Sequence, residues 1–149
     1  MKKTFYILLF AIIGVISLVS CGDDNDGDKT FDQAAAQAAA GTYDGTYSSV
    51  SDNGTTLTEQ GTMTISAKSD YVGMFTFSCT ALGVSHESIA NICHSNDGFA
   101  FSNNLKTNGL GNAFLGRIDD AQNVEAHLQM VLVGGTKTYS VIFTGHKRQ

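Results

Sequence analysis

The residues of this chain with the most distinctive chemistry are three cysteines and four histidines among 149 residues. Two of the cysteines, Cys79 and Cys93, flank an irregular connection between two expected strands. In an oxidising compartment they could form a disulfide, which would stabilise the fold by about 3 kcal/mol for a loop of about 15 residues. Two buried, reduced thiols are the alternative. A simple hairpin favours that alternative, because it would place Cys79 opposite residues near Glu87.

The histidines do not form a recognisable metal or catalytic motif. They are His86, His94, His127 and His146. Zinc sites commonly draw their ligands from closely spaced pairs, which are missing here. The sequence also contains no Gly-x-Ser-x-Gly elbow and no phosphate-binding glycine loop. We therefore expect no metal, no cofactor and no enzymatic activity.

The first 20 residues have the pattern of a secretory signal peptide. Lys2 and Lys3 precede an uncharged, largely apolar run from Phe5 to Ser20. This run is shorter than the roughly 20 residues that a membrane-spanning helix needs, and it ends in small residues. No later run of apolar residues is as long, so we expect no membrane-spanning segment in the rest of the chain.

The third cysteine lies directly after this leader, and "Leu18-Val19-Ser20-Cys21" resembles the lipobox of bacterial lipoproteins. The resemblance implies that a peptidase cuts before Cys21 and that the Cys21 sulfur carries a diacylglycerol. Fatty acids such as palmitate would then hold the protein on a membrane, stably so if there is more than one chain. A plain signal peptide with an incidental cysteine is the alternative.

An acidic run follows the cysteine at once. Four aspartates occur between Gly22 and Asp28, where they repel one another and have little apolar surface to bury. We expect a disordered tether here. The run also resembles the surface-export signal of Bacteroidetes lipoproteins, which implies a place on the outer face of the outer membrane. A periplasmic orientation stays open.

The charge of the chain argues against nucleic acid as a partner. Its 14 acidic residues outnumber its 9 lysines and arginines, and the formal net charge is −5. The one basic cluster is the terminal His146-Lys147-Arg148. Phosphate backbones are bound by clustered Lys and Arg, so a membrane, an envelope protein or a small apolar molecule is a better candidate.

The chain divides into three parts. Residues 1–20 form the signal peptide, and residues 21–40 hold the tether followed by an alanine-rich stretch over 30–40 that favours a short helix or linker. Residues 41–149 form the folded domain. They show the two-residue apolar period of β-strands, separated by turn signals such as Asn53-Gly54. The predicted strands cover 41–47, 62–67, 71–79, 88–93, 99–101, 113–118, 124–132 and 138–145.

About eight strands with short connections predict an all-β antiparallel fold. Closing them into an up-and-down barrel would leave no free sheet edge, whereas a two-sheet sandwich is the alternative. The stretches "GTYDGTY" and "YSVIFTGHK" resemble the calycin-like barrel domains of Bacteroidetes lipoproteins. Lipocalins, which are calycins, open with a glycine-x-aromatic element, and Gly41-Thr42-Tyr43 matches it with tyrosine in place of tryptophan. The resemblance covers roughly 41–147 and implies an eight-stranded barrel but no particular activity.

An eight-stranded barrel can be filled by its own side chains or can hold one small ligand. Tyr43, Tyr47 and Tyr71 could line a ligand mouth, since tyrosine joins an apolar ring to a polar tip, or they could be ordinary strand residues. We expect a non-catalytic envelope lipoprotein that binds a small apolar molecule or a macromolecule. The alternative is a structural or interaction protein with a filled barrel. Such a protein could be an accessory subunit or a protease inhibitor, since some calycin-fold proteins inhibit proteases.

Overall fold

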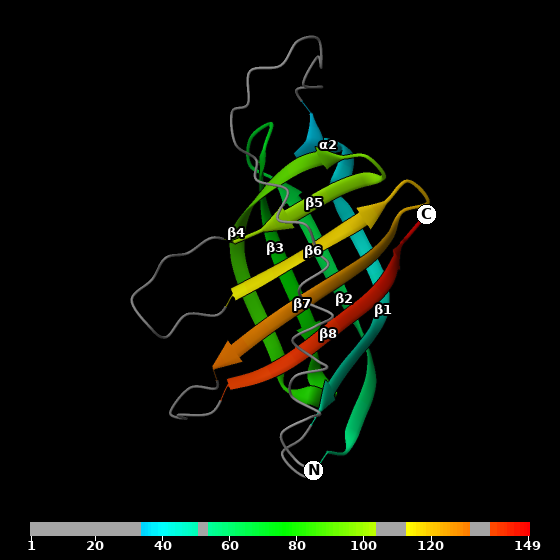
Figure 1. Ribbon diagram of the computed structural model, residues 1–149, viewed down its shortest axis with the longest axis vertical. Coiled ribbons are helices and arrows are strands. Elements are labelled where there is room, and N and C mark those ends of the chain that lie inside the picture. Colours follow the sequence, from blue (N-terminus) through cyan, green and yellow to red (C-terminus); the bar gives the residue numbers. More distant parts are fainter. Residues whose placement is uncertain (1–33, 51–53, 104–112, 132–137) are drawn as a thin grey trace.

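The computed structural model describes residues 34–50, 54–103, 113–131 and 138–149. A short helix precedes eight strands, and a single turn of 3-10 helix, η1, joins the third strand to the fourth (Figure 1). The elements are α2 (Ala35–Ala39), β1 (Gly41–Val50), β2 (Thr56–Ala67), β3 (Val72–Cys79), η1 (Thr80–Leu82), β4 (Val84–Ser95), β5 (Gly98–Ser102), β6 (Ala113–Asp119), β7 (Asn123–Val131) and β8 (Thr138–Lys147).

The strands form one closed antiparallel barrel in which each strand pairs with its neighbours in sequence. The first and last strands complete the ring, with Tyr43 opposite Lys147 and Tyr47 opposite Phe143. The predicted up-and-down barrel is therefore confirmed, and the sandwich alternative is excluded.

The two-residue period sets which side chains enter the core. In β7, Val124, Ala126 and Leu128 are buried and point inward, as predicted, while His127 lies outward between them. The same alternation in β3 turns Phe75 and Phe77 inward and leaves Thr76 exposed. One buried hydrophobic cluster results, with contributions from all eight strands.

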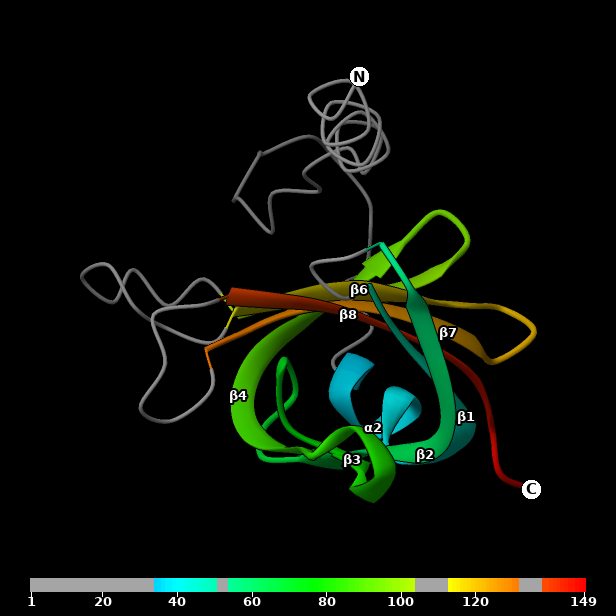
Figure 2. The ribbon, with the colours of Figure 1, turned by 90° about the horizontal axis from the view of Figure 1, so that it is seen from below.

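The alanine-rich segment folds as α2 and closes one end of the barrel. Ala35, Ala36 and Ala39 are fully buried, and Figure 2 shows α2 within the ring of strands. A helix of five residues is too short to be stable alone, so its packing against the barrel must hold it. The backbone N–H of Ala36 donates to the carbonyl of Asp70 at 3.0 Å, which ties α2 to the turn between β2 and β3.

Two strands begin four or more residues earlier than predicted. β2 begins at Thr56 rather than at residue 62, and β4 begins at Val84 rather than at residue 88. The added residues of β2 from Thr56 to Gln60 are all exposed, so no apolar alternation marks them. In β4 the added outward residues Ser85 and Glu87 are exposed, and the inward His86 is polar.

Candidate functional site

Aromatic side chains fill the middle of the barrel, where a carrier would need a cavity. The ring centroid of Phe75 lies 4.7 Å from that of Phe101 and 5.0 Å from that of Phe114. On the other side of the barrel, Tyr47 and Phe143 are in ring contact at 4.7 Å. These rings are at most 3% exposed. Of the two interiors left open by the sequence, the described residues form the packed one.

Tyr43 and Tyr47 belong to this core and do not line a solvent-facing mouth. Both are fully buried. The Tyr43 hydroxyl donates to the carbonyl of Ala39 at 2.7 Å, and the Tyr47 hydroxyl donates to that of Thr62 at 2.6 Å. The Tyr47 oxygen also accepts the N–H of Ser78 at 3.2 Å. Both hydroxyls therefore form hydrogen bonds with main-chain groups inside the protein. The expectation that Tyr43 and Tyr47 line a ligand mouth is corrected by this burial.

Burial also makes these two phenols harder to ionise. Desolvation raises the pKa of Tyr43 to about 12 and raises the pKa of Tyr47 as well. Both stay neutral donors across the physiological range. The third tyrosine of the expected mouth, Tyr71, is 44% exposed and lies just before β3, apart from the core.

The C-terminal strand fastens the helix that closes the barrel. The Lys147 ammonium donates to the carbonyl of Ala38 in α2 at 3.0 Å and lies 6.0 Å from the ring centroid of Tyr43. The Lys147 backbone N–H donates to the carbonyl of Gln122 at 3.1 Å. Lys147 thus joins α2, β1 and the turn between β6 and β7.

The next residue, Arg148, fastens β1. Its guanidinium contacts both carboxylate oxygens of Asp44, at 2.8 and 2.5 Å, and its backbone N–H donates to the carbonyl of Thr42 at 2.7 Å. The hydrogen bond from Arg148 lowers the pKa of Asp44 against an opposing contribution from desolvation, and the Arg148 charge adds a smaller lowering contribution. Both side chains are more than half exposed, so this pair positions the chain end more than it stabilises the fold.

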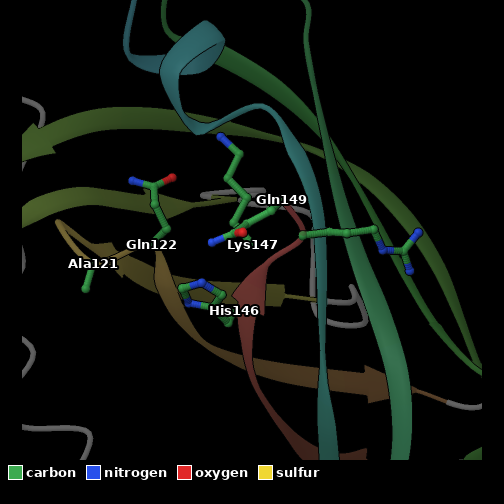
Figure 3. Close-up of a pocket in the computed structure, with 6 residues that line it drawn as sticks. Ala121, Gln122, His146, Lys147 and Gln149 are labelled. Carbon is green, nitrogen blue, oxygen red and sulfur yellow. The ribbon is translucent and has the colours of Figure 1, made fainter.

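A cleft of about 330 Å³ lies beside these contacts (Figure 3). It is lined by Ala121, Gln122, His146, Lys147, Arg148 and Gln149. Lys147 points from it toward α2, Arg148 is held by Asp44, and the His146 ring contacts the side chain of Asn123 at 3.1 Å. The side chains of His146, Lys147 and Arg148 are therefore already engaged within the protein.

Gln122, which lines this cleft, has an unusual backbone conformation. Its φ of 65° lies in the left-handed region, where a non-glycine residue is strained. The N–H of Gln122 donates to the carbonyl of Asp119 at 2.8 Å, so Gln122 follows a tight turn at the position where hairpins often use glycine. Hairpin geometry explains the strain without a ligand.

Sequence reasoning missed the structural role of Lys147 and Arg148. From the sequence alone, the basic cluster His146-Lys147-Arg148 indicated only a local positive charge and no contact with the rest of the fold. Its role follows from closure of the barrel, because closure brings β8 beside β1 and places Lys147 opposite Tyr43. A lysine two or three residues past an alternating last strand is the signal that could have suggested it.

The predicted bridge between Cys79 and Cys93 is wrong. Cys79 pairs with Val84 at the beginning of β4, whereas Cys93 pairs with Ala100 near the end of that strand. The strand from Val84 to Cys93 spans about 30 Å, while disulfides join Cα atoms less than about 7 Å apart. Cys79 is a free, buried thiol whose Sγ donates to the carbonyl of Gln60 at 3.5 Å.

The histidines lie on separate parts of the barrel. His127 contacts the Glu125 carboxylate at 2.7 Å on the outer surface, whereas His86 stacks near Phe77 and has a pKa lowered by burial. Within the part of the chain that the structure describes, no three His, Cys, Asp or Glu side chains are grouped to hold a metal ion.

Cys21, the expected lipidation site, lies outside the described residues. Among the described residues, no helix has the length and apolar character needed to cross a membrane. The chain matches no protein-family model and no curated protein.

Proposed function

We propose that this chain is an envelope lipoprotein whose filled barrel binds a macromolecule at its outer surface and catalyses no reaction. The packed interior supports this most directly. Phe75, Phe101 and Phe114 occupy the volume that a small apolar ligand would need, at ring separations of 4.7 to 6.1 Å. An envelope protein is therefore a better partner than a small molecule carried inside.

The proposed location rests on the amino-terminal sequence. Leu18-Val19-Ser20-Cys21 supports acylation of Cys21, and the aspartates that follow support display on the outer face of the outer membrane. α2 is the first described element after this tether. It closes one end of the barrel, which leaves the outer wall and the opposite end for a partner.

We expect the Cys21→Ser variant to lose acylation completely, because serine offers no sulfur for the thioether. Cells fed labelled palmitate should label the wild-type protein but not the variant, and the variant should move from the membrane pellet to the soluble fraction. Cys79→Ala is the matched control, since Cys79 is buried, and it should keep both the label and the membrane association. Equal labelling of the Cys21→Ser variant would contradict the proposed anchor.

A further inference from the structure

Helix α2 fills one end of the barrel with little apolar surface of its own. Its buried side chains are the methyl groups of Ala35, Ala36 and Ala39, which lie within the ring of strands (Figure 2). Each methyl group removes far less apolar area from water than a phenylalanine ring in the middle of the barrel does. Ala34 at the N-cap supplies no side-chain hydrogen bond, and a helix of five residues is unstable alone. α2 therefore depends on its attachments to the strands.

Main-chain atoms of α2 make the polar attachments that the structure describes. The N–H of Ala36 donates to a carbonyl in the turn between β2 and β3 at 3.0 Å. The carbonyl of Ala39 accepts the Tyr43 hydroxyl at 2.7 Å, and the carbonyl of Ala38 accepts the Lys147 ammonium at 3.0 Å. The contact with Lys147 is exposed, so water competes for both of its partners. A small number of hydrogen bonds, one of them open to solvent, thus holds the helix in place.

Gly41 supplies a hinge directly after α2. Its φ of +148° is a conformation that residues with a side chain rarely adopt. A Cβ at Gly41 would lie 2.6 Å from the Cε of Lys147, so the Lys147 side chain passes beside this glycine on its way to Ala38. Figure 3 shows Lys147 directed toward α2. The flexible residue and the lysine that spans it therefore lie at the same joint between α2 and β1.

The ring of strands closes without a contribution from α2. β1 completes the barrel by pairing with β2 on one side and β8 on the other. The ring contacts of Phe75, Phe101 and Phe114 join β3, β5 and β6 in the middle of the barrel. Loss of α2 from its position would leave this pairing and these ring contacts in place. Segments held by few contacts commonly open at a lower free energy than the whole fold.

We propose that α2 undocks from the end of the barrel as a unit, turning about Gly41, and that Lys147 is the latch that holds it. The eight strands stay paired in the undocked state. Residues 34–40 then join the segment that precedes the barrel, and these seven residues add at most about 25 Å when extended. The undocking does not depend on the lipid anchor. The longer reach of the barrel from a membrane does rest on the proposed function.

Hydrogen exchange followed by NMR tests the undocking. The sample is the mature chain with Cys21→Ser, so that the result does not depend on acylation. The N–H groups of Ala36 and Ala38 should have protection factors at least about tenfold lower than those of the β7 ladder, because local opening exposes them without global unfolding. Equal protection of α2 and β7 would overturn the proposal.

The Lys147→Met variant tests the latch. It keeps an apolar side chain beside Gly41 but loses the ammonium, so exchange in α2 should become about tenfold faster while exchange in β7 is unchanged. Arg148→Gln is the matched control, because the Arg148 side chain binds Asp44 on β1, and it should leave exchange in α2 as in the wild type. Equal effects of the two variants on α2 would contradict the role of Lys147.

The Gly41→Ala variant tests the hinge from the other side of the same joint. Alanine disfavours the φ of +148°, and its Cβ would displace the Lys147 side chain, so α2 should again exchange faster. Unchanged exchange in this variant would refute the hinge. Loss of palmitate labelling with local exchange retained would overturn the anchor alone. Normal labelling without local exchange of α2 would overturn the undocking alone.

Discussion

Replacing Phe75 by alanine is expected to lower the free energy of unfolding by about 3–5 kcal/mol, the cost of deleting a large aromatic side chain from a packed core. Phe75 is fully buried and contacts the rings of Phe77, Phe101 and Phe114. Its removal would leave an apolar hole bordered by the rings of β5 and β6 and by its own strand β3. Urea denaturation of the mature chain, followed by circular dichroism, would measure the change.

Thr76→Ala is the control for this measurement. Thr76 follows Phe75 on the same strand but points outward and is exposed, so its truncation should cost less than about 1 kcal/mol. If Phe75→Ala were no more damaging than Thr76→Ala, the interior would not be packed around this ring.

Gly45→Ala is expected to destabilise the protein at the junction that closes the barrel. Gly45 on β1 lies opposite Gly145 on β8. A Cβ on Gly45 would overlap the carbonyl oxygen of Thr144 and would lie 2.6 Å from the Cα of Gly145. Both are backbone atoms, so β8 itself must move. Overpacking typically costs about 1–3 kcal/mol, and we expect the upper end of this range.

The same denaturation experiment would measure the effect of Gly45→Ala. Thr46→Ala is the matched control, because it changes the adjacent residue of β1 without adding an atom, and its effect should be below about 1 kcal/mol. A Gly45→Ala variant as stable as wild type would contradict the close approach of β1 and β8.

The barrel could be predicted from the sequence because its strands alternate clearly. β7 and β8 show this best, since one buried face requires an apolar residue at every second position. The early parts of β2 and β4 could not be predicted in the same way. Residues Thr56–Gln60 are exposed on both faces, so nothing but hydrogen bonding to β1 makes them a strand.

The candidate site was harder to predict, because its contacts depend on register. A tyrosine at an inward position of a strand gives the same sequence pattern whether it lines a ligand mouth or packs in the core. Only the hydrogen-bond partners of the Tyr43 and Tyr47 hydroxyls show that these two residues belong to the core. The sequence separation of Cys79 and Cys93 is compatible with a disulfide. The pairing of Cys79 with Val84, however, places the two cysteines far apart in the barrel. Lys147 gains its partner Ala38 from the far end of the chain, and the closure of the barrel brings the two residues together.

Native mass spectrometry of the mature protein, purified from its own envelope, is the most direct test of a filled barrel that acts at its surface. We predict a monomer mass equal to that of the polypeptide with its covalent lipid and nothing more. A stoichiometric extra mass that organic solvent removes as a small apolar molecule would contradict the account, because Phe75 and its neighbours leave no room for one.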